Sequence, residues 1–316
     1  MKTSTSKRLR WNVAIWLAAG LFMTGAAGMA SGPIMPDPKA EARHQPQVEE
    51  TANGIPLVNI TAPSSGGVSR NEYETFNVPD KGAILNNSYT LSKTELAGYV
   101  QGNNNMAERP AKIIVNEVTG AGSTSMDGFL EVAGNRADVV IANPNGITVN
   151  GGGFINTGKA FLTTGKPVYD GEDHLQRFDI TGGDILIEGK GLGGKETGSL
   201  AILSRAVRIN AGIWAKDLHI TTGTNTVDAK TLEASAIEGK GGCPAFALDT
   251  AAIGGMYAGR ITLVGTEKGL GVNNSGTWSA EDNLTLDWNG DLKNSGTIYS
   301  KGNTDPVSYT HLTPVS

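Results

Sequence analysis

Three glycines and a lysine form a motif-like string in this chain of 316 residues. Gly189, Gly191 and Gly194 spell G-x-G-x-x-G, and together with Lys195 the segment approaches a P-loop. A P-loop holds phosphates at the start of a helix and needs Ser or Thr after its lysine. Glu196 occupies that position here, and no helical pattern follows. We therefore interpret the segment as a flexible turn rather than a nucleotide-binding site.

Three acidic residues near this string could serve a different chemistry. If Asp179, Asp184 and Glu188 lined a groove, they would supply the paired carboxylates that glycoside hydrolysis requires. A β-helical polysaccharide-degrading enzyme is therefore the alternative function. Carboxylates are also expected on the turns of an acidic protein, and this explanation needs no active site.

The histidines and the single cysteine form no recognisable catalytic or metal-binding pattern. His44, His174, His219 and His311 are widely separated, without the spacing of a metal site, and we expect them at the surface. Cys243 has no second cysteine with which to form a disulfide and no partner motif for catalysis. We expect it to be a small buried residue. The sequence thus predicts no catalytic residue, no metal and no cofactor, and a protein that is not an enzyme.

The amino terminus has the features of an export signal. Basic residues at positions 2, 7, 8 and 10 precede an apolar run from Trp11 to Met23, which is shorter than the roughly 20 residues of a transmembrane helix. Small residues follow, so we expect a signal peptide over residues 1–30, cleaved near Ala30 or Ala27, with an uncleaved anchor as the alternative. Residues 1–30 hold four basic and no acidic side chains, so without them the net charge changes from −5 to −9. That charge disfavours nucleic acid as a partner.

Composition and periodicity indicate an all-β protein. The 43 glycines are about twice the usual share, and glycine, asparagine, serine and threonine disfavour helix. Apolar residues recur at every second position, most clearly where Leu284, Leu286 and Trp288 alternate with polar residues. The same alternation is seen for Leu218 and Ile220, and again for Ile261 and Leu263. Such segments predict short strands with one buried face.

A repeat in the carboxy-terminal third predicts how these strands are organised. The tetrapeptide Asn-Ser-Gly-Thr at residues 274–277 returns at 294–297, a spacing of 20 residues. Fixed periods of this size are typical of solenoids. Strands of about five residues separated by Gly and Asn turns fit the coil of a parallel β-helix better than the hairpin of a sandwich. A β-sandwich remains the alternative fold.

The segment Asn143-Pro144-Asn145-Gly146-Ile147 follows a predicted buried strand over residues 138–142. Pro144 fixes its φ near −65°, whereas Asn145 and Gly146 can accept positive φ. Asparagine amides can also bond the backbone of their own turn. The residues themselves therefore predict a tight turn after a strand.

This motif, with its surroundings, resembles the two-partner secretion domain of filamentous haemagglutinins, large haemolysins and contact-dependent growth inhibition proteins. The similar segments cover about residues 50–300 in family order and include residues 69–71, 76–78, 82–88, 116–118, 213–218 and 254–259. Many members carry a second motif, Asn-Pro-Asn-Leu, before the segment 116–118. Here Asn103, Asn104, Asn105 and Met106 stand in its place. The resemblance implies that both motifs either contact a transporter or only stabilise the fold.

The resemblance also implies the fold and the function. The fold would be a right-handed parallel β-helix with an N-terminal capping region and small extra-helical β elements. The function would be secretion and folding nucleation for a large surface exoprotein, an adhesin or a carrier of a growth inhibition toxin. The expected partner is a dedicated outer-membrane β-barrel transporter, through its periplasmic domains. Export would lead through the periplasm of a Gram-negative bacterium to the cell surface or the medium, and regions beyond this chain would bind host or neighbouring-cell receptors.

Four segments follow from these expectations. Residues 1–30 are the predicted signal peptide, and residues 31–55 a lead-in segment. Residues 56–302 are the predicted two-partner secretion β-helix with the start of haemagglutinin-type repeats. The repeat rhythm stops after Gly302, so residues 303–316 are predicted to be an irregular or non-native tail.

Overall fold

The computed structural model describes residues 33–107, 109–306 and 312–314. The regular structure of these residues is β-strand apart from two short 3-10 helices, η1 (Ala42–His44) and η2 (Asn104–Met106). The predicted signal peptide and His311 lie outside the described residues. Among the residues that are described, no helix is long and apolar enough to cross a membrane.

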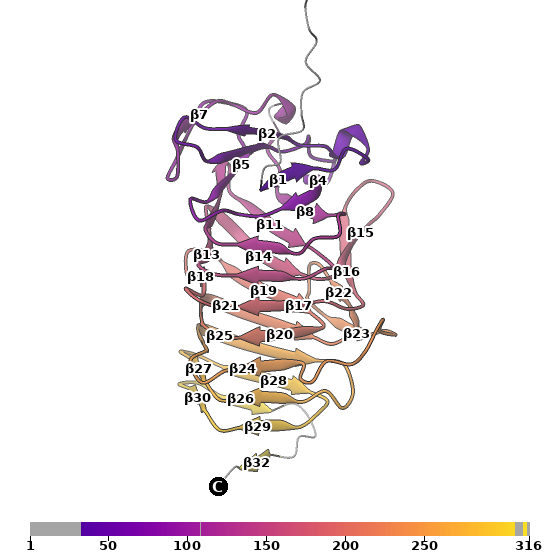
Figure 1. The fold of residues 1–316 in the computed structure, drawn as a ribbon, viewed down its shortest axis with the longest axis vertical. Helices are drawn as coiled ribbons and strands as arrows, with labels where there is room; N and C mark the ends of the chain where they lie inside the picture. Colours follow the sequence, from indigo (N-terminus) through magenta and orange to yellow (C-terminus); the bar gives the residue numbers. More distant parts are fainter. Residues whose placement is uncertain (1–32, 108, 307–311, 315–316) are drawn as a thin grey trace, which may run out of the picture. The chain divides into compact units, whose positions relative to one another are not determined.

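Most strands belong to three stacks, in each of which neighbouring strands run parallel (Figure 1). The first stack contains β3 (Pro56–Asn59), β5 (Ala83–Asn87), β10 (Phe129–Gly134), β13 (Gly152–Ile155), β18 (Leu192–Gly194), the first halves of β21 (Gly212–Thr222) and β25 (Gly255–Gly265), β27 (Thr277–Ala280) and β30 (Thr297–Ser300). The second contains β4 (Val68–Phe76), β8 (Ile113–Val118), β11 (Ala137–Ala142), β14 (Thr157–Thr163), β19 (Ser199–Ser204), the second halves of β21 and β25, β28 (Leu284–Trp288) and β31 (Thr304–Pro306). The third contains β9 (Thr124–Met126), β12 (Ile147–Val149), β17 (Asp184–Ile187), β20 (Ala206–Ile209), β24 (Leu248–Thr250), β26 (Val272–Asn274), β29 (Leu292–Asn294) and β32 (Leu312–Pro314).

The chain visits the three stacks in turn, so each circuit is one coil of a parallel β-helix. This arrangement confirms the predicted architecture and excludes the β-sandwich. The 20-residue repeat corresponds to one coil, because Asn274 pairs with Asn294 in the third stack. The amide of Asn274 donates to the Oδ1 atom of Asn294 at 2.8 Å across that interval of 20 residues. Identical side chains thus stack from one coil to the next.

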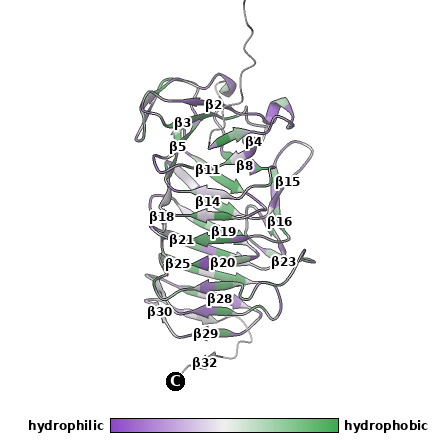
Figure 2. Ribbon diagram, in the orientation of Figure 1, coloured by the Kyte–Doolittle hydropathy of each residue, from purple (hydrophilic) through white to green (hydrophobic). Residues whose placement is uncertain are grey.

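The core is built from columns of inward-facing apolar residues. In the second stack Ile202, Ile220, Leu263 and Leu286 occupy equivalent positions on successive coils, and all four are buried. Leu218 is buried in the neighbouring column, whereas Asp287, between Leu286 and Trp288, is exposed, as the alternation predicted. Figure 2 shows hydrophobic residues along these strands throughout the stack.

Three additions surround the coils. At the amino-terminal end β1 (Ile34–Pro36) pairs antiparallel with β4, and β2 (Gln47–Glu50) pairs antiparallel with β3. The strands β6 (Ser92–Thr94) and β7 (Gly98–Val100) form a separate hairpin. An antiparallel sheet outside the helix contains β15 (Lys166–Tyr169), β16 (Leu175–Ile180), β22 (Asn225–Asp228) and β23 (Ala234–Ala236). Phe178 and Val227 of this sheet pack on outward-facing Phe161 and Leu203 of the second stack.

Candidate functional site

The turn at Asn143–Gly146 joins β11 of the second stack to β12 of the third. The side chain of Asn143 is fully buried, and Ile147 begins β12 as a buried residue. Pro144 and Asn145 are exposed between them. The turn therefore anchors its first and last residues in the fold and presents its two central residues to solvent.

Two asparagine side chains hold this turn. The Asn143 amide donates to the carbonyl of Gly122 at 2.9 Å and to the Thr124 hydroxyl at 3.0 Å, while its Oδ1 atom accepts from the backbone N–H of Asn145 at 2.9 Å. The Asn145 amide donates to the carbonyl of Gly120 at 2.8 Å. Because Gly120 and Gly122 belong to the preceding coil, the two asparagines tie successive coils together.

The backbone of the turn differs from the expectation in one respect. Gly146 has a φ of +108°, in the region that favours glycine, but Asn145 does not adopt a positive φ. The following coil contributes Gly183, with a φ of +81°, where an added Cβ atom would lie 2.7 Å from the carbonyl oxygen of Pro144. Only a residue without a side chain fits beneath the turn.

The segment Asn103–Met106 forms a second turn of the same kind. The Asn103 amide donates to the carbonyls of Ile60 at 2.8 Å and Asn86 at 2.9 Å, and its Oδ1 atom accepts from the N–H of Asn105 at 3.0 Å. The Asn105 amide donates to the carbonyl of Ile60 at 3.1 Å. Asn103 and Met106 are buried, whereas Asn104 is exposed. With Asn104 and Met106 in place of proline and leucine, this turn makes the same internal bond as the Asn143 turn, from the third residue's N–H to the first asparagine's Oδ1.

Two more buried asparagines lie at the capped end of the second stack. Asn71 and Asn116 occupy the same inward-facing column as the apolar residues of later coils. The Oδ1 atom of Asn71 accepts from the N–H of Thr61 at 2.9 Å, and that of Asn116 accepts from the Tyr73 hydroxyl at 3.1 Å. These bonds satisfy polar groups where the apolar column ends.

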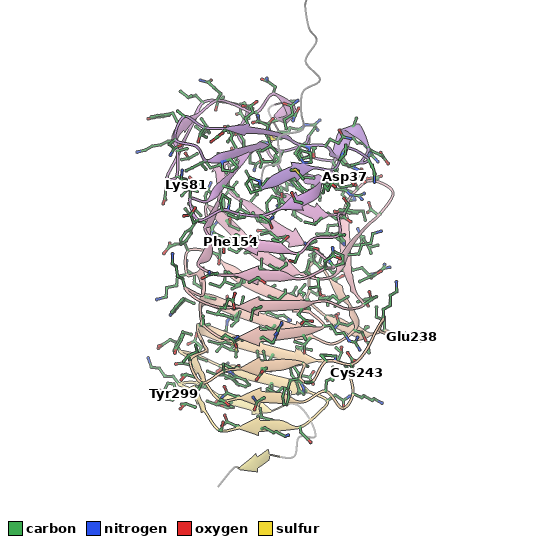
Figure 3. The ribbon with its side chains drawn as sticks, in the orientation of Figure 1. Asp37, Lys81, Phe154, Glu238, Cys243 and Tyr299 are labelled. Atoms are coloured by element: carbon green, nitrogen blue, oxygen red, sulfur yellow. The ribbon has the colours of Figure 1, made fainter. Side chains whose placement is uncertain are left out.

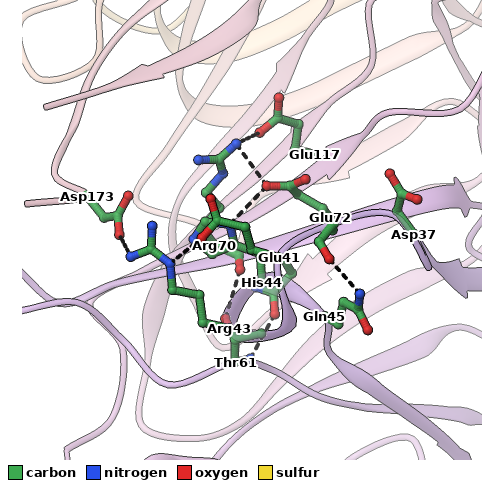
Figure 4. Close-up of polar contacts among 12 residues, drawn as sticks. Asp37, Glu41, Arg43, His44, Gln45, Thr61, Arg70, Glu72, Glu117 and Asp173 are labelled. Carbon is green, nitrogen blue, oxygen red and sulfur yellow. Dashed lines mark hydrogen bonds and ion pairs between the residues drawn. The ribbon is translucent and has the colours of Figure 1, made fainter. Parts of the chain in front are cut away.

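Outside this column a charged cluster joins the capping region to the first coils (Figure 4). The Arg70 guanidinium contacts Glu72 at 2.8 Å and Glu117 at 3.4 Å, and it lies 4.5 Å from the centroid of the Tyr169 ring. The Nδ1 atom of His44 lies 3.1 Å from the Glu72 carboxylate. Glu72 and Glu117 are directly paired on neighbouring strands, so Arg70 offsets the repulsion between them.

Burial sets the protonation behaviour of this charged cluster. Burial raises the pKa of Glu117, against the opposing charge of Arg70. Burial also lowers the pKa of His44, helped by the same guanidinium. A cavity of about 360 Å³, lined in part by His44, Arg70 and Asn105, connects the cluster to the second asparagine turn. The sequence did not identify this cluster, although Arg70 and Glu117 fall within segments that resembled the family.

The structure corrects two expectations about isolated residues. His44 is buried rather than at the surface, because η1 lays it against β4 and Glu72. His174 and His219 are partly buried. Cys243 is exposed rather than buried (Figure 3), because it lies in the excursion between β23 and β24 and not at an inward strand position. Its Sγ atom is 3.9 Å from the guanidinium of Arg205.

The glycine string and the acidic residues have structural explanations. Gly189 and Gly191 form the turn between β17 and β18 with φ of +55° and +79°. Asp179 is paired with Arg177 at 2.8 Å, and Asp184 faces Arg208 at 3.4 Å. Glu188 lies at the turn that follows β17. Across residues 33–107, 109–306 and 312–314, no cluster of three or more His, Cys, Asp or Glu side chains could hold a metal ion.

Comparison with known proteins identifies the family. The model of the TPS secretion domain family matches residues 33–298. The protein named Toxin CdiA from Yersinia pestis is 42% identical over 298 residues, which are 87% of this chain and 9% of that protein. The protein named 16S rRNA endonuclease CdiA from Enterobacter cloacae is 44% identical over 280 residues, 87% of this chain and 8% of that protein. The chain thus spans less than a tenth of the length of these relatives.

A solved structure agrees with the family match. The crystal structure of the filamentous hemagglutinin secretion domain superposes with a TM-score of 0.75 at 31% identity, covering 87% of this chain and 95% of that chain. These matches give no support to a polysaccharide-degrading enzyme. The stacked coils, the two asparagine turns and the family match lead to one conclusion: the chain belongs to the family of TPS secretion domains.

Proposed function

We propose that residues 56–302, with the lead-in at 31–55, direct secretion and nucleate folding of a large surface exoprotein, and that this segment is not itself an enzyme. The match of residues 33–298 to the TPS secretion domain carries the proposal. The partner is an outer-membrane β-barrel transporter that binds this segment through periplasmic domains. The signal peptide at residues 1–30 leads to the periplasm of a Gram-negative bacterium, and the product reaches the cell surface or the medium.

The coil geometry supports the folding part of the proposal. Each coil of the described region pairs with its neighbours, as β25 pairs with β21 before it and with β27 and β28 after it. In solenoids of this kind, folding propagates from one repeat to the next. The antiparallel strands β1 and β2 cover the amino-terminal end, so growth proceeds toward the carboxy terminus. The coils of this domain then act as a template for those that follow.

The asparagine turn at residues 143–147 and its counterpart at 103–106 are the proposed recognition or stabilising elements. The exposed Pro144 can test direct contact, because no hydrogen bond of its side chain is lost when it becomes alanine. The buried Asn143 tests the fold, because isoleucine there would leave the carbonyl of Gly122 and the N–H of Asn145 without their partners.

The experiment is an export assay with the chain co-produced with its transporter. Asn143→Ile and Asn145→Ile should reduce the amount of protein outside the cell, and normal export of both would refute a role for the turn. Pro144→Ala, shown to be folded by thermal denaturation, separates the two mechanisms. Loss of export in that variant identifies a contact with the transporter, whereas normal export assigns the turn to the fold. Tyr99→Ala, at an exposed position on the β6–β7 hairpin, is the matched control.

A further inference from the structure

An aromatic column runs along the outer face of the first stack. The strand registers place seven residues at equivalent outward positions on successive coils: Phe129, Gly153, Gly193, Trp214, Tyr257, Ser279 and Tyr299. Four of the seven are aromatic in a chain whose aromatic content is 6%. The column therefore concentrates a residue type that the sequence otherwise uses sparingly.

Three of these aromatic side chains are exposed and Trp214 is half-buried, and the neighbouring backbone makes room for them. Phe129, Tyr257 and Tyr299 are 43%, 38% and 50% exposed, and Figure 3 shows Tyr299 at the outer edge of the coil. A Cβ atom at Gly212 would lie 2.5 Å from the Trp214 ring, and one at Gly255 would lie 2.8 Å from the Tyr257 hydroxyl. Both rings thus lie against bare backbone on their own strands.

Trp214 and Tyr257 form the centre of the column. Their rings are nearly parallel, at 15°, with centroids 6.2 Å apart. They line a groove of about 700 Å³ that also holds three cationic and three acidic side chains: Lys195, Lys216, Arg260, Asp217, Glu281 and Asp282. The Arg260 guanidinium is fixed by two bonds to Asp217 at 2.7 and 2.8 Å. The groove therefore combines flat apolar surfaces with charged hydrogen-bonding groups.

Two lysine side chains contribute positive charge to the groove. Lys195, directly after β18, and Lys216, on β21, each lie two residues beyond the aromatic column and are exposed. Within the described part of the chain, neither amine is paired with a carboxylate within 4.0 Å. By contrast, Lys301 further along the same face is paired with Glu281. The two lysines are thus available to an anionic ligand beside the Trp214 ring.

We propose that this groove binds an acidic polysaccharide chain. The faces of pyranose rings present C–H groups, which are attracted to the negative face of an aromatic ring, while their hydroxyls bond charged and polar groups at the rim. Carboxylate substituents would be held by Lys195 and Lys216. The repeated coils offer a long polymer equivalent positions along the column. A second protein is a poorer fit, because the centres of protein interfaces are depleted of charged residues.

This binding site is independent of the secretion function. It lies on the first stack at β18, β21 and β25, whereas the Asn143 turn joins the second and third stacks. Binding of a polysaccharide and passage through the transporter can therefore succeed or fail separately.

The test uses titration calorimetry and tryptophan fluorescence on the purified chain, with oligogalacturonate as the acidic probe and the fully methyl-esterified oligomer of equal length as its neutral counterpart. Trp11 and Trp16 lie in the predicted signal peptide, and among the described residues Trp278 and Trp288 are fully buried. In the chain without its signal peptide, the fluorescence change should therefore come from Trp214. We expect Trp214→Ala to weaken binding about tenfold or more, equivalent to about 1.4 kcal/mol, and Trp214→Phe to retain most of the affinity. Tyr99→Ala, at an exposed aromatic outside the column, should leave binding unchanged.

The charged half of the site has its own test. Lys195→Gln combined with Lys216→Gln should remove the preference for the acidic over the esterified oligomer while leaving the fold unchanged by circular dichroism. Absence of binding by the unaltered chain at millimolar oligomer would overturn the proposal. Binding that is the same in Trp214→Ala as in the parent would also overturn it, as would self-association through this face that the oligomers do not inhibit.

Discussion

The turns at Asn103–Met106 and Asn143–Gly146 make the same hydrogen bonds with different residues. In both, a buried first asparagine accepts from the N–H two residues on, and the third residue donates its amide to a carbonyl elsewhere in the fold. The middle residue is Asn104 in one and Pro144 in the other, and both are exposed. The comparison shows that the two asparagines determine the turn, whereas proline only restricts its backbone.

The largest effect should come from the first asparagine of each turn. Asn103→Ala and Asn143→Ala should each lower the free energy of unfolding by about 2–4 kcal/mol, because at least two buried groups lose a partner at about 1–3 kcal/mol each. Urea denaturation of both variants provides the measurement. A large loss in only one of them would show that the two turns are not equivalent.

A pH titration should separate the contribution of the turns from that of His219. Burial lowers the pKa of His219 from 6.5 to about 4. Between these two pH values, His219 therefore binds a proton in the unfolded chain but not in the folded chain. The contribution of His219 to the free energy of unfolding is fully present above pH 6.5. As the pH falls toward 4, the free energy of unfolding decreases by about 3 kcal/mol. His219→Gln should lack this loss relative to the parent, whereas Asn143→Ala should follow the parent curve, because the turn contains no titratable group. Parallel curves for His219→Gln and the parent would contradict this assignment.

The positive-φ residues at the two turns, Gly146 within one and Ala107 directly after the other, should respond in opposite directions. Gly146 has a φ of +108°, so Gly146→Ala should cost about 1–3 kcal/mol through backbone strain. Ala107 has a φ of +40°, which is unfavourable for alanine, so Ala107→Gly should stabilise the fold by about 1 kcal/mol. Thermal denaturation of the two variants tests the pair, and shifts of equal sign would disprove it.

The smallest effect concerns the middle residue. Asn103 has φ −81° and ψ +117°, a conformation compatible with a following proline. Asn104→Pro should therefore be tolerated and should stabilise the fold by about 0.4–1 kcal/mol by restricting the unfolded chain. A destabilised variant, detected in the same denaturation series, would mean that Asn104 contributes bonds of its own.

The strands and their stacking could be predicted from the sequence because both depend on local patterns. Alternation identified the buried faces of Leu218 and Leu263, and the repeated Asn-Ser-Gly-Thr set the length of a coil. The turn after residue 142 was also recognisable, since asparagine, proline and glycine have known backbone preferences.

The remaining features depend on contacts between distant segments. Arg70 meets Glu117 only through the register of β4 with β8, which no local pattern specifies. The exposure of Cys243 and the burial of His44 follow from excursions outside the regular coil. The aromatic column becomes visible only when the register of successive coils is known. Because the excursions between those coils differ in length, its residues have no regular spacing in the sequence.

The coil of 20 residues has a mechanical consequence. Drawn out straight, 20 residues span about 66–72 Å, yet a closed coil adds only about 4.8 Å along the stack. At about 0.1 kcal/mol per residue, closing a coil of 20 residues releases about 2 kcal/mol. Because the chain shortens by more than 60 Å as the coil closes, this free energy corresponds to a mean tension of about 2 pN. Coils that form on one side of a narrow opening would therefore pull the remaining chain through it, with no nucleotide hydrolysis at the opening.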